Sequence, residues 1–117
     1  MKVVFISVGR KFLKEKTAVL IYGAGAAGML TKNALIKDAH IRYEIVAYID
    51  DNHKKENKLL EGIPVISPDT ALNANYIKQH RIQQVIISIQ NLESDKKNLV
   101  VEKGINLKLK VKVVPAV

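Results

Sequence analysis

Two groups of residues in this sequence have the types and the spacing to bind an anionic ligand. The first is a glycine-rich segment with the G-x-G-x-x-G spacing, Gly23-Ala24-Gly25-Ala26-Ala27-Gly28. The second is a pair of acids, Asp50 and Asp51, which lies about 20 residues further along, the distance expected in dinucleotide-binding units. Together they predict a nucleotide site, because bare backbone amides bind phosphates and a carboxylate accepts hydrogen bonds from ribose hydroxyls.

Each glycine of this segment has a separate predicted role. Gly23 allows a tight turn after a strand, Gly25 lets the backbone approach a pyrophosphate, and Gly28 lets a helix pack closely on the strand. Amides at the start of that helix point at the anion and are aided by the helix dipole. Asp50 disfavours a 2′-phosphate by charge repulsion, so a dinucleotide ligand is predicted to be NAD rather than NADP.

The elements that must position these residues can be identified from their hydrophobicity. Short apolar runs that end at Tyr22, Ile49 and Ile89 are typical of strands buried on both faces of a parallel sheet. After the glycines, one apolar stripe at helical spacing predicts a helix packed on the sheet, formed by Ala27, Leu30, Thr31, Ala34 and Leu35, whereas Lys32 falls outside it. The residues after the third strand complete the predicted site by position, namely Ser88, Ile89, Gln90 and Asn91.

Further elements follow the second strand. Residues 53–61 are predicted to form a surface loop, and 62–66 leave room for a short extra strand. Ser67-Pro68-Asp69 is a typical helix start, and that helix is predicted to run to about His80. Another helix is predicted over 95–103 and is ended by Gly104. Residues 105–113 alternate strictly and predict an edge strand with lysines on its exposed face.

The alternation of strands and helices predicts an α/β fold with a Rossmann-like, doubly wound, mainly parallel sheet and helices on both faces. The length of 117 residues suits one domain, which we place at 17–117, with 1–16 as an N-terminal extension or linker. Residues 2–16 leave three interpretations open: an additional strand, a helix lying on the domain, or an ordered linker.

The formal net charge of +8 is compatible with three interpretations: a nucleic-acid partner, an anionic membrane surface as partner, or lysines that are merely solvated. Only three residues are arginine and only 5% are aromatic, so the composition argues against nucleic acid as a partner. There is no cysteine, which excludes disulfides and thiolate sites. No apolar run is long enough to span a membrane, so this piece is expected to be soluble.

No group of residues predicts catalysis or metal binding. The histidines at 40, 53 and 80 are far apart and lack metal-ligand spacing. No tyrosine is followed four residues later by a lysine, and no serine nucleophile motif is present. We therefore expect the chain to bind a ligand without catalytic residues of its own. A competing interpretation is that the glycines serve packing alone and that the acids only form a turn.

The glycine segment, Tyr48-Ile49-Asp50-Asp51-Asn52 and Gly62-Ile63-Pro64-Val65 together resemble the nucleotide-binding domain of CapD-like polysaccharide biosynthesis proteins. The resemblance covers about residues 16–117 and includes the strand at 84–89. It implies a fragment of a nucleoside-diphosphate-sugar 4,6-dehydratase or epimerase that serves capsular or surface polysaccharide synthesis. The ligand it implies is NAD or a nucleotide sugar.

In that family, membrane helices precede this domain and a dehydrogenase-type catalytic domain follows it. The resemblance therefore implies that catalytic domain as a partner, a possible homo-oligomer, and a location on the cytoplasmic side of the bacterial inner membrane, with basic ends near anionic lipid. The N-terminal domain of sugar O-acyltransferases is also similar, but its glycine turn usually carries a histidine where this chain has Ala26-Ala27. An oligomerisation or interdomain module without a ligand is the remaining alternative.

Overall fold

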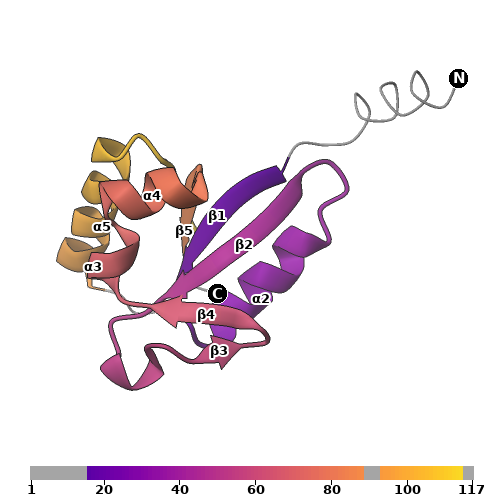
Figure 1. The fold of residues 1–117 in the computed structure, drawn as a ribbon, viewed down its shortest axis with the longest axis horizontal. Coiled ribbons are helices and arrows are strands. Elements are labelled where there is room, and N and C mark those ends of the chain that lie inside the picture. The colour runs from indigo at the N-terminus through magenta and orange to yellow at the C-terminus, as the bar shows by residue number, and fades with distance from the viewer. Residues whose placement is uncertain (1–15, 89–92, 115–117) are drawn as a thin grey trace, which may run out of the picture.

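The structure, a computed structural model, describes residues 16–88 and 93–114. Within these ranges, strands and helices alternate along the chain (Figure 1). The strands are β1 (Lys16–Tyr22), β2 (Arg42–Ile49), β3 (Leu59–Leu60), β4 (Ile63–Ile66), β5 (Gln84–Ile87) and β6 (Lys110–Val113). The helices are α2 (Ala26–Ile36), α3 (Pro68–Ala71), α4 (Ala74–His80) and α5 (Ser94–Asn106), with a short 3-10 helix η1 (His53–Lys55).

The strands form one six-stranded sheet in the order β3-β4-β2-β1-β5-β6. All neighbouring pairs are parallel except β3 and β4, which form an antiparallel hairpin. β1 lies in the middle because its apolar run can be buried on both faces, and Val19, Leu20 and Ile21 are fully buried. The predicted α/β, Rossmann-like fold is therefore confirmed, and residues 59–60 add a hairpin strand within the predicted loop.

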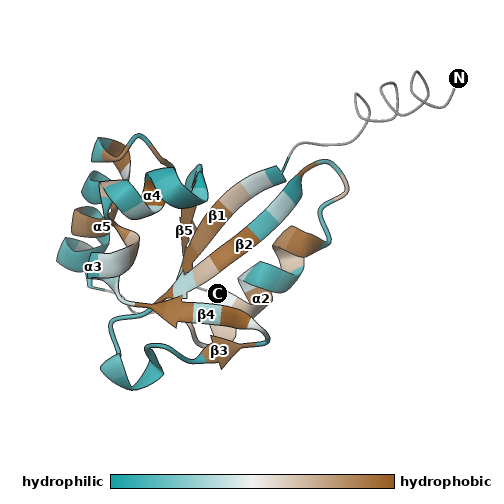
Figure 2. Cartoon of the chain, in the orientation of Figure 1, coloured by the Kyte–Doolittle hydropathy of each residue, from teal (hydrophilic) through white to brown (hydrophobic). Residues whose placement is uncertain are grey.

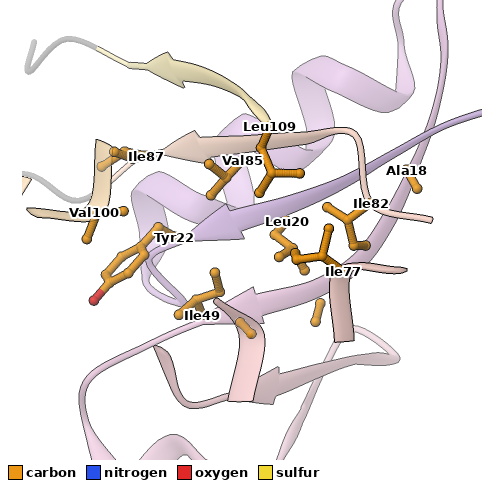
Figure 3. Close-up of a cluster of buried hydrophobic side chains, with 12 residues drawn as sticks. Ala18, Leu20, Tyr22, Ile49, Ile77, Ile82, Val85, Ile87, Val100 and Leu109 are labelled. Carbon is orange, nitrogen blue, oxygen red and sulfur yellow. The ribbon is translucent and has the colours of Figure 1, made fainter. Parts of the chain in front are cut away.

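The helices are shared unequally between the two faces of the sheet. α3, α4 and α5 lie on one side, and α2 lies on the other (Figure 1). The larger hydrophobic cluster is on the side of α3–α5, where Leu20, Ile49, Val85 and Val100 pack together (Figure 3). The cluster beneath α2 is much smaller, with Ile21, Ala24, Tyr48 and Val65 as its buried members. The sheet is therefore well covered on one face and sparsely covered on the other.

The orientation of α2 differs from the predicted one. The residues of α2 that are buried are Gly28 and Lys32, whereas Leu30 keeps 70% of its surface exposed and Ala34 is also exposed. The apolar stripe therefore does not face the sheet along its length. The physical reason is that Gly28 must lie against the end of β1, and the Lys32 ammonium forms an ion pair with Glu61 of the β3–β4 turn.

The end of α5 also corrects the prediction. Gly104 does not end the helix, which continues to Asn106, and the strand is limited to Lys110–Val113. Gly104 is buried against the sheet, since a Cβ there would lie 2.7 Å from Val111 Cγ2. The turn that ends α5 uses Lys108 at a φ of 61° and a hydrogen bond from the Leu109 amide to the Gly104 carbonyl, 2.9 Å. β6 does lie at the sheet edge, as predicted.

The predicted helix start at Ser67 is confirmed, because the Ser67 hydroxyl accepts a hydrogen bond from the Thr70 amide. The helix does not run on to His80 without a break, however. Asn73 interrupts it and caps α4 by accepting hydrogen bonds from the amides of Asn75 and Tyr76. Two short helices therefore replace one long helix.

No helix in the described ranges is both long and apolar enough to cross a membrane. The N-terminal segment 2–15 lies outside the described residues, so its three interpretations and the boundary at residue 16 stay predictions. Lys16 itself begins β1.

Candidate functional site

The predicted site lies where β1 ends and α2 begins, at the carboxyl edge of the parallel sheet. Gly23 takes a φ of 121°, a conformation that residues with a side chain rarely adopt. Its amide donates a 2.7 Å hydrogen bond to the Ile49 carbonyl of β2. The turn is thereby held against the strand that carries the two acids.

Gly25 and Gly28 differ in what surrounds them. A Cβ on Gly28 would lie 1.9 Å from the Gly23 carbonyl oxygen, so this glycine is required for the helix to pack. A Cβ on Gly25 would meet nothing within 4 Å. Gly25 therefore has no packing reason to be glycine, and the space beside its backbone is open.

The start of α2 leaves backbone amides free to bind a ligand. Gly25 is the N-cap residue, and no side chain caps the helix. The amides of the first helical turn, at Ala26, Ala27 and Gly28, have no acceptor inside the helix. Together with the positive end of the helix dipole they form a surface suited to a phosphate. The first turn of α2 carries no acid that would oppose an anion.

Asp50 faces the glycine turn. Its Oδ2 accepts a hydrogen bond from the Ala24 amide at 3.0 Å, and its Oδ1 accepts one from the Asn52 amide at 2.8 Å. The Lys55 ammonium lies 3.8 Å from Oδ2, and 17% of the Asp50 side chain is exposed. The carboxylate is thus anchored to the chain, although a carboxylate offers about four acceptor positions and two of them remain for other donors.

Asp51 points the other way, toward the large core cluster. It accepts a 2.8 Å hydrogen bond from the buried Tyr22 hydroxyl and pairs with the Lys96 ammonium of α5 at 2.5 Å. Burial raises the pKa of Tyr22 well above its usual range, and the hydrogen bond and charge of Asp51 act in the same direction. Asp51 therefore connects β2 to β1 and α5.

The residues predicted to complete the site after the third strand are only partly described. Ser88 follows β5 directly and is buried; its amide donates to the Tyr22 carbonyl at 2.9 Å, and its hydroxyl lies 3.3 Å from the same oxygen. Ile89, Gln90 and Asn91 lie outside the described residues. The structure thus brings together the glycine turn, Asp50, Asp51 and Ser88 at one edge, and ligand contacts by any of them stay a prediction.

Three residues at this edge were not identified from the sequence. Tyr22 was assigned only to a strand, and Lys55 and Lys96 belong to a chain with 19 basic residues. A single lysine among so many gives no signal of its own, so only the fold could place these two beside the acids. Among the described residues, no cluster of histidine and carboxylate side chains could hold a metal ion.

Comparison with known proteins gives one family match. The family model described as C2185-like, N-terminal, matches residues 15–110, which is most of the chain. A comparison with curated proteins found no match.

Solved structures with the same fold were also found. The chain is 30% identical to UDP-D-quinovosamine 4-dehydrogenase from Vibrio fischeri, with a TM-score of 0.77, and the match covers 88% of this chain and 81% of that one. It is similar in fold to RSP, a Rex-family repressor, at 13% identity and a TM-score of 0.69, covering 97% of this chain and 58% of that one. RSP in complex with beta-NADH matches at 14% identity and a TM-score of 0.64, and the match covers 97% of this chain and 61% of that one. The chain thus spans less than two thirds of these Rex-family chains.

Proposed function

The chain belongs to the C2185-like, N-terminal family, and from this premise we propose that it is the nucleotide-binding module of a sugar-nucleotide enzyme. Its ligand is NAD or a nucleotide sugar, bound by its phosphates at the start of α2. The observation that carries the proposal is the uncapped first turn of α2, preceded by a glycine that packing does not require.

The contacts of the site support phosphate binding. Gly25 leaves the backbone bare, and Ala26 and Ala27 add only methyl groups beside their free amides. The Lys55 and Lys96 ammonium groups each balance one of the nearby carboxylates. The two acids therefore add little net negative charge that would oppose a pyrophosphate.

Asp50 is proposed to bind a ribose. Its carboxylate is already oriented toward the glycine turn by the Ala24 and Asn52 amides, and it retains acceptor positions for the two hydroxyls of an adenosine. An acid there favours NAD over NADP. Ile89 and Gln90 are proposed to close the site from the end of β5, as their place in the sequence predicts.

The enzyme class rests on the relatives. The 30% identical structure is that of UDP-D-quinovosamine 4-dehydrogenase, and a Rex-family structure of the same fold was solved with beta-NAD+ and operator DNA. The CapD-like resemblance adds the finer proposal that the whole protein is a nucleoside-diphosphate-sugar 4,6-dehydratase or epimerase for capsular or surface polysaccharide. The same resemblance leads us to propose that the catalytic step belongs to a separate, dehydrogenase-type domain.

The direct test is titration of the purified chain with NADH and with a UDP-sugar by isothermal calorimetry. A Gly25→Val variant should fold, since a Cβ at that position meets nothing, but its side chain should block the phosphates. We expect it to weaken binding by about tenfold or more, the effect of losing one good charge-assisted contact. Ala74→Val, a similar enlargement at the exposed first residue of α4, is the matched control and should bind normally.

A different outcome would favour a second function. Asp50 and Asp51 are both engaged in bonds within the chain, which is what a ligand-free interdomain module would also show. If neither ligand produces heat with the unchanged chain, the proposal of a nucleotide site fails and a ligand-free oligomerisation or interdomain module is favoured. The acyltransferase interpretation would gain support if the reading frame downstream encoded hexapeptide repeats instead of a dehydrogenase with a tyrosine–lysine pair.

We also propose that the basic surface contacts an anionic membrane on the cytoplasmic side. The described chain offers Lys103, Lys108 and Lys110 as exposed cations near its C-terminal end. Such lysines are attracted to anionic lipid within a Debye length. Co-sedimentation with phosphatidylserine vesicles, lost at high salt, is the expected result; equal sedimentation with neutral vesicles would contradict it.

A further inference from the structure

A groove adjoins the start of α2 on the side away from Asp50. The ends of β2, β1, β5 and β6 follow one another in this order along the sheet, and Asp50 follows β2 whereas Ser88 follows β5. The groove has a volume of about 550 Å³, a size typical of small-molecule sites. Its lining includes Ala26, Ala27 and Ser88 and extends along α2 to Leu35. It is therefore continuous with the amides proposed to bind the phosphates.

The groove is open and its walls are mainly apolar. Among the described helices, α3, α4 and α5 lie on the opposite face of the sheet, so α2 alone borders β5 and β6 on this side (Figure 1). Figure 2 shows hydrophobic bands on α2 on either side of a hydrophilic one. Large apolar side chains line the groove, among them Leu30, Ile86, Val113 and Val114. Leu30 keeps 70% of its surface exposed.

The polar groups that line the groove already have partners within the chain. The Thr31 hydroxyl donates a 2.9 Å hydrogen bond to a carbonyl one turn earlier in α2, and the Ser88 hydroxyl lies 3.3 Å from the carbonyl at the end of β1. The Lys112 ammonium lies 3.4 Å from the Tyr43 hydroxyl and 5.8 Å from the centre of that ring. No carboxylate is among the lining residues that the structure describes. The groove therefore offers apolar contacts and one positive charge.

Building on the nucleotide site proposed above, we infer that this groove takes the nicotinamide half of a dinucleotide and selects the reduced cofactor, NADH. With the adenosine ribose at Asp50 and the pyrophosphate at the start of α2, the other half of the ligand continues toward β5 and β6. There the uncharged dihydronicotinamide ring can bury its faces against Leu30 and Ile86. Its single carboxamide can stay at the open side of the groove, in contact with water.

The oxidised ring suits the same groove less well. The nicotinamide ring of NAD+ carries a positive charge, which would lose water in the apolar groove without gaining a carboxylate. The Lys112 ammonium is positive as well and repels that ring. Reduction removes the charge of the ring and leaves its size almost unchanged. The groove should therefore bind NADH more tightly than NAD+.

A nucleotide sugar in the same orientation would also bind less well. Its hexose would bring several hydroxyl groups into a groove whose own polar groups are engaged. Each buried hydroxyl without a partner lowers the affinity, because its hydrogen bonds to water are not replaced. The groove thus favours the dinucleotide among the two ligand classes proposed above.

Calorimetric titration of the 117-residue chain with NADH, NAD+ and ADP-ribose separates the groove from the phosphate site. ADP-ribose contains the adenosine, the pyrophosphate and the second ribose, but it lacks the nicotinamide ring. We expect NADH to bind about tenfold or more tightly than NAD+. NADH should also bind more tightly than ADP-ribose, and UDP-glucose should bind more weakly than NADH.

Net charge needs a control of its own, because NAD+ carries one negative charge fewer than NADH and the chain is basic. ADP-ribose has the same net charge as NADH, so a difference between these two ligands reports the ring alone. Raised salt screens the long-range attraction between the chain and any of the ligands. The preference for NADH over NAD+ should persist there, because it arises inside the groove.

Lys112→Met tests the charge of the groove directly. The substitution should tighten the binding of NAD+ several-fold and change that of NADH little, because the lysine repels the oxidised ring. Lys110→Met is the matched control, since it removes the same charge from the same strand at an exposed residue outside the groove lining. It should leave the ratio of the two affinities unchanged, and both variants should show wild-type circular dichroism.

The outcomes distinguish this inference from the proposed function on which it rests. If NADH, NAD+ and ADP-ribose bind equally well, the phosphate site stands and the groove takes no ring. Equal changes for NADH and NAD+ in Lys112→Met, or tighter binding of UDP-glucose than of NADH, would also overturn the inference alone. If none of the four ligands binds, the proposed nucleotide site fails and this inference fails with it.

Discussion

The amide of Ala24 donates a 3.0 Å hydrogen bond to the carboxylate of Asp50. This bond joins the glycine turn to the end of the neighbouring strand, and Ala24 is only 6% exposed. The acid therefore has a structural task before any ligand arrives. It satisfies a backbone donor that water reaches poorly, and it holds the turn in the shape that exposes the next amides.

Asp50→Ala should consequently destabilise the fold. It leaves the buried Ala24 amide without an acceptor, which costs about 1–3 kcal/mol of the free energy of unfolding. Asp50→Asn keeps an amide oxygen in the same place and should lose less. Urea unfolding followed by circular dichroism measures both, with Glu102→Ala, an exposed acid in the body of α5, as the control. If Asp50→Ala unfolded like the control, the bond would have no structural importance.

Gly28 and Gly25 should respond oppositely to the same substitution. Gly28→Ala places a Cβ 1.9 Å from a backbone oxygen that cannot move aside, so we expect a loss of about 3 kcal/mol or more, or failure to fold. Gly25→Ala should change stability by about 1 kcal/mol at most, the ordinary difference between these residues at a helix start. Thermal unfolding of both variants decides this, and equal stability would show that α2 can shift.

Residue types and spacing were sufficient to predict the alternation of strands and helices, the mainly parallel sheet and the position of Asp50 beside the glycine turn. A buried strand and a glycine turn are local features, because their residues lie next to one another in the sequence. Tyr22 to Asp51 and Lys96 to Asp51 are contacts between distant segments. Nothing in the spacing of these residues specifies them, so they became visible only in the fold.

The orientation of α2 was predicted incorrectly for a related reason. The apolar residues Leu30 and Ala34 suggested a face that packs on the sheet, but Gly28 and the Lys32–Glu61 pair determine which side of the helix is buried. Periodicity reports that a helix has an apolar side. It does not report whether that side meets the sheet of the same chain or a different surface.

The Lys32–Glu61 pair fixes α2 to the β3–β4 hairpin, whose turn has Glu61 and Gly62 at φ values of 51° and 81°. Glu61→Gln should lower the free energy of unfolding, because the ammonium of Lys32 keeps only a neutral partner. Lys32→Met combined with Glu61→Gln should recover more than half of that loss, since no buried charge remains. Urea unfolding in a double-mutant cycle measures the coupling between the two residues. Purely additive effects of Lys32→Met and Glu61→Gln on the free energy of unfolding would contradict this prediction.

This pair also predicts a pH dependence. The hydrogen bond to Glu61 raises the pKa of Lys32, and burial opposes it with a smaller effect. The folded state therefore holds this proton more tightly than the unfolded chain. The stabilisation is complete below the usual lysine pKa of about 10.4 and is lost as the pH rises through the higher folded value. In Lys32→Met this part of the alkaline loss of stability should be absent.

Two buried tyrosines should make the fold sensitive to alkali in the same direction. Burial raises the pKa of Tyr22 and of Tyr48, so both keep their protons in the folded state above pH 10 or so, where an unfolded tyrosine ionises. The unfolded state then binds fewer protons, and the free energy of unfolding falls as the pH rises. In an alkaline titration, the part of the tyrosinate absorbance that comes from these two residues should therefore appear only at the pH at which circular dichroism shows that the chain unfolds.

At neutral pH the same two tyrosines should differ. The Tyr22 hydroxyl donates to Asp51, so Tyr22→Phe should cost about 1 kcal/mol or somewhat more for a bond to a charged group. The buried Tyr48 hydroxyl has no hydrogen-bond partner among the described residues, so Tyr48→Phe should be neutral or stabilising. Both variants should reduce the alkaline loss of stability, because each removes one proton that only the unfolded state releases. A Tyr48→Phe variant less stable than Tyr22→Phe at neutral pH would show that the Tyr48 hydroxyl has an acceptor in solution.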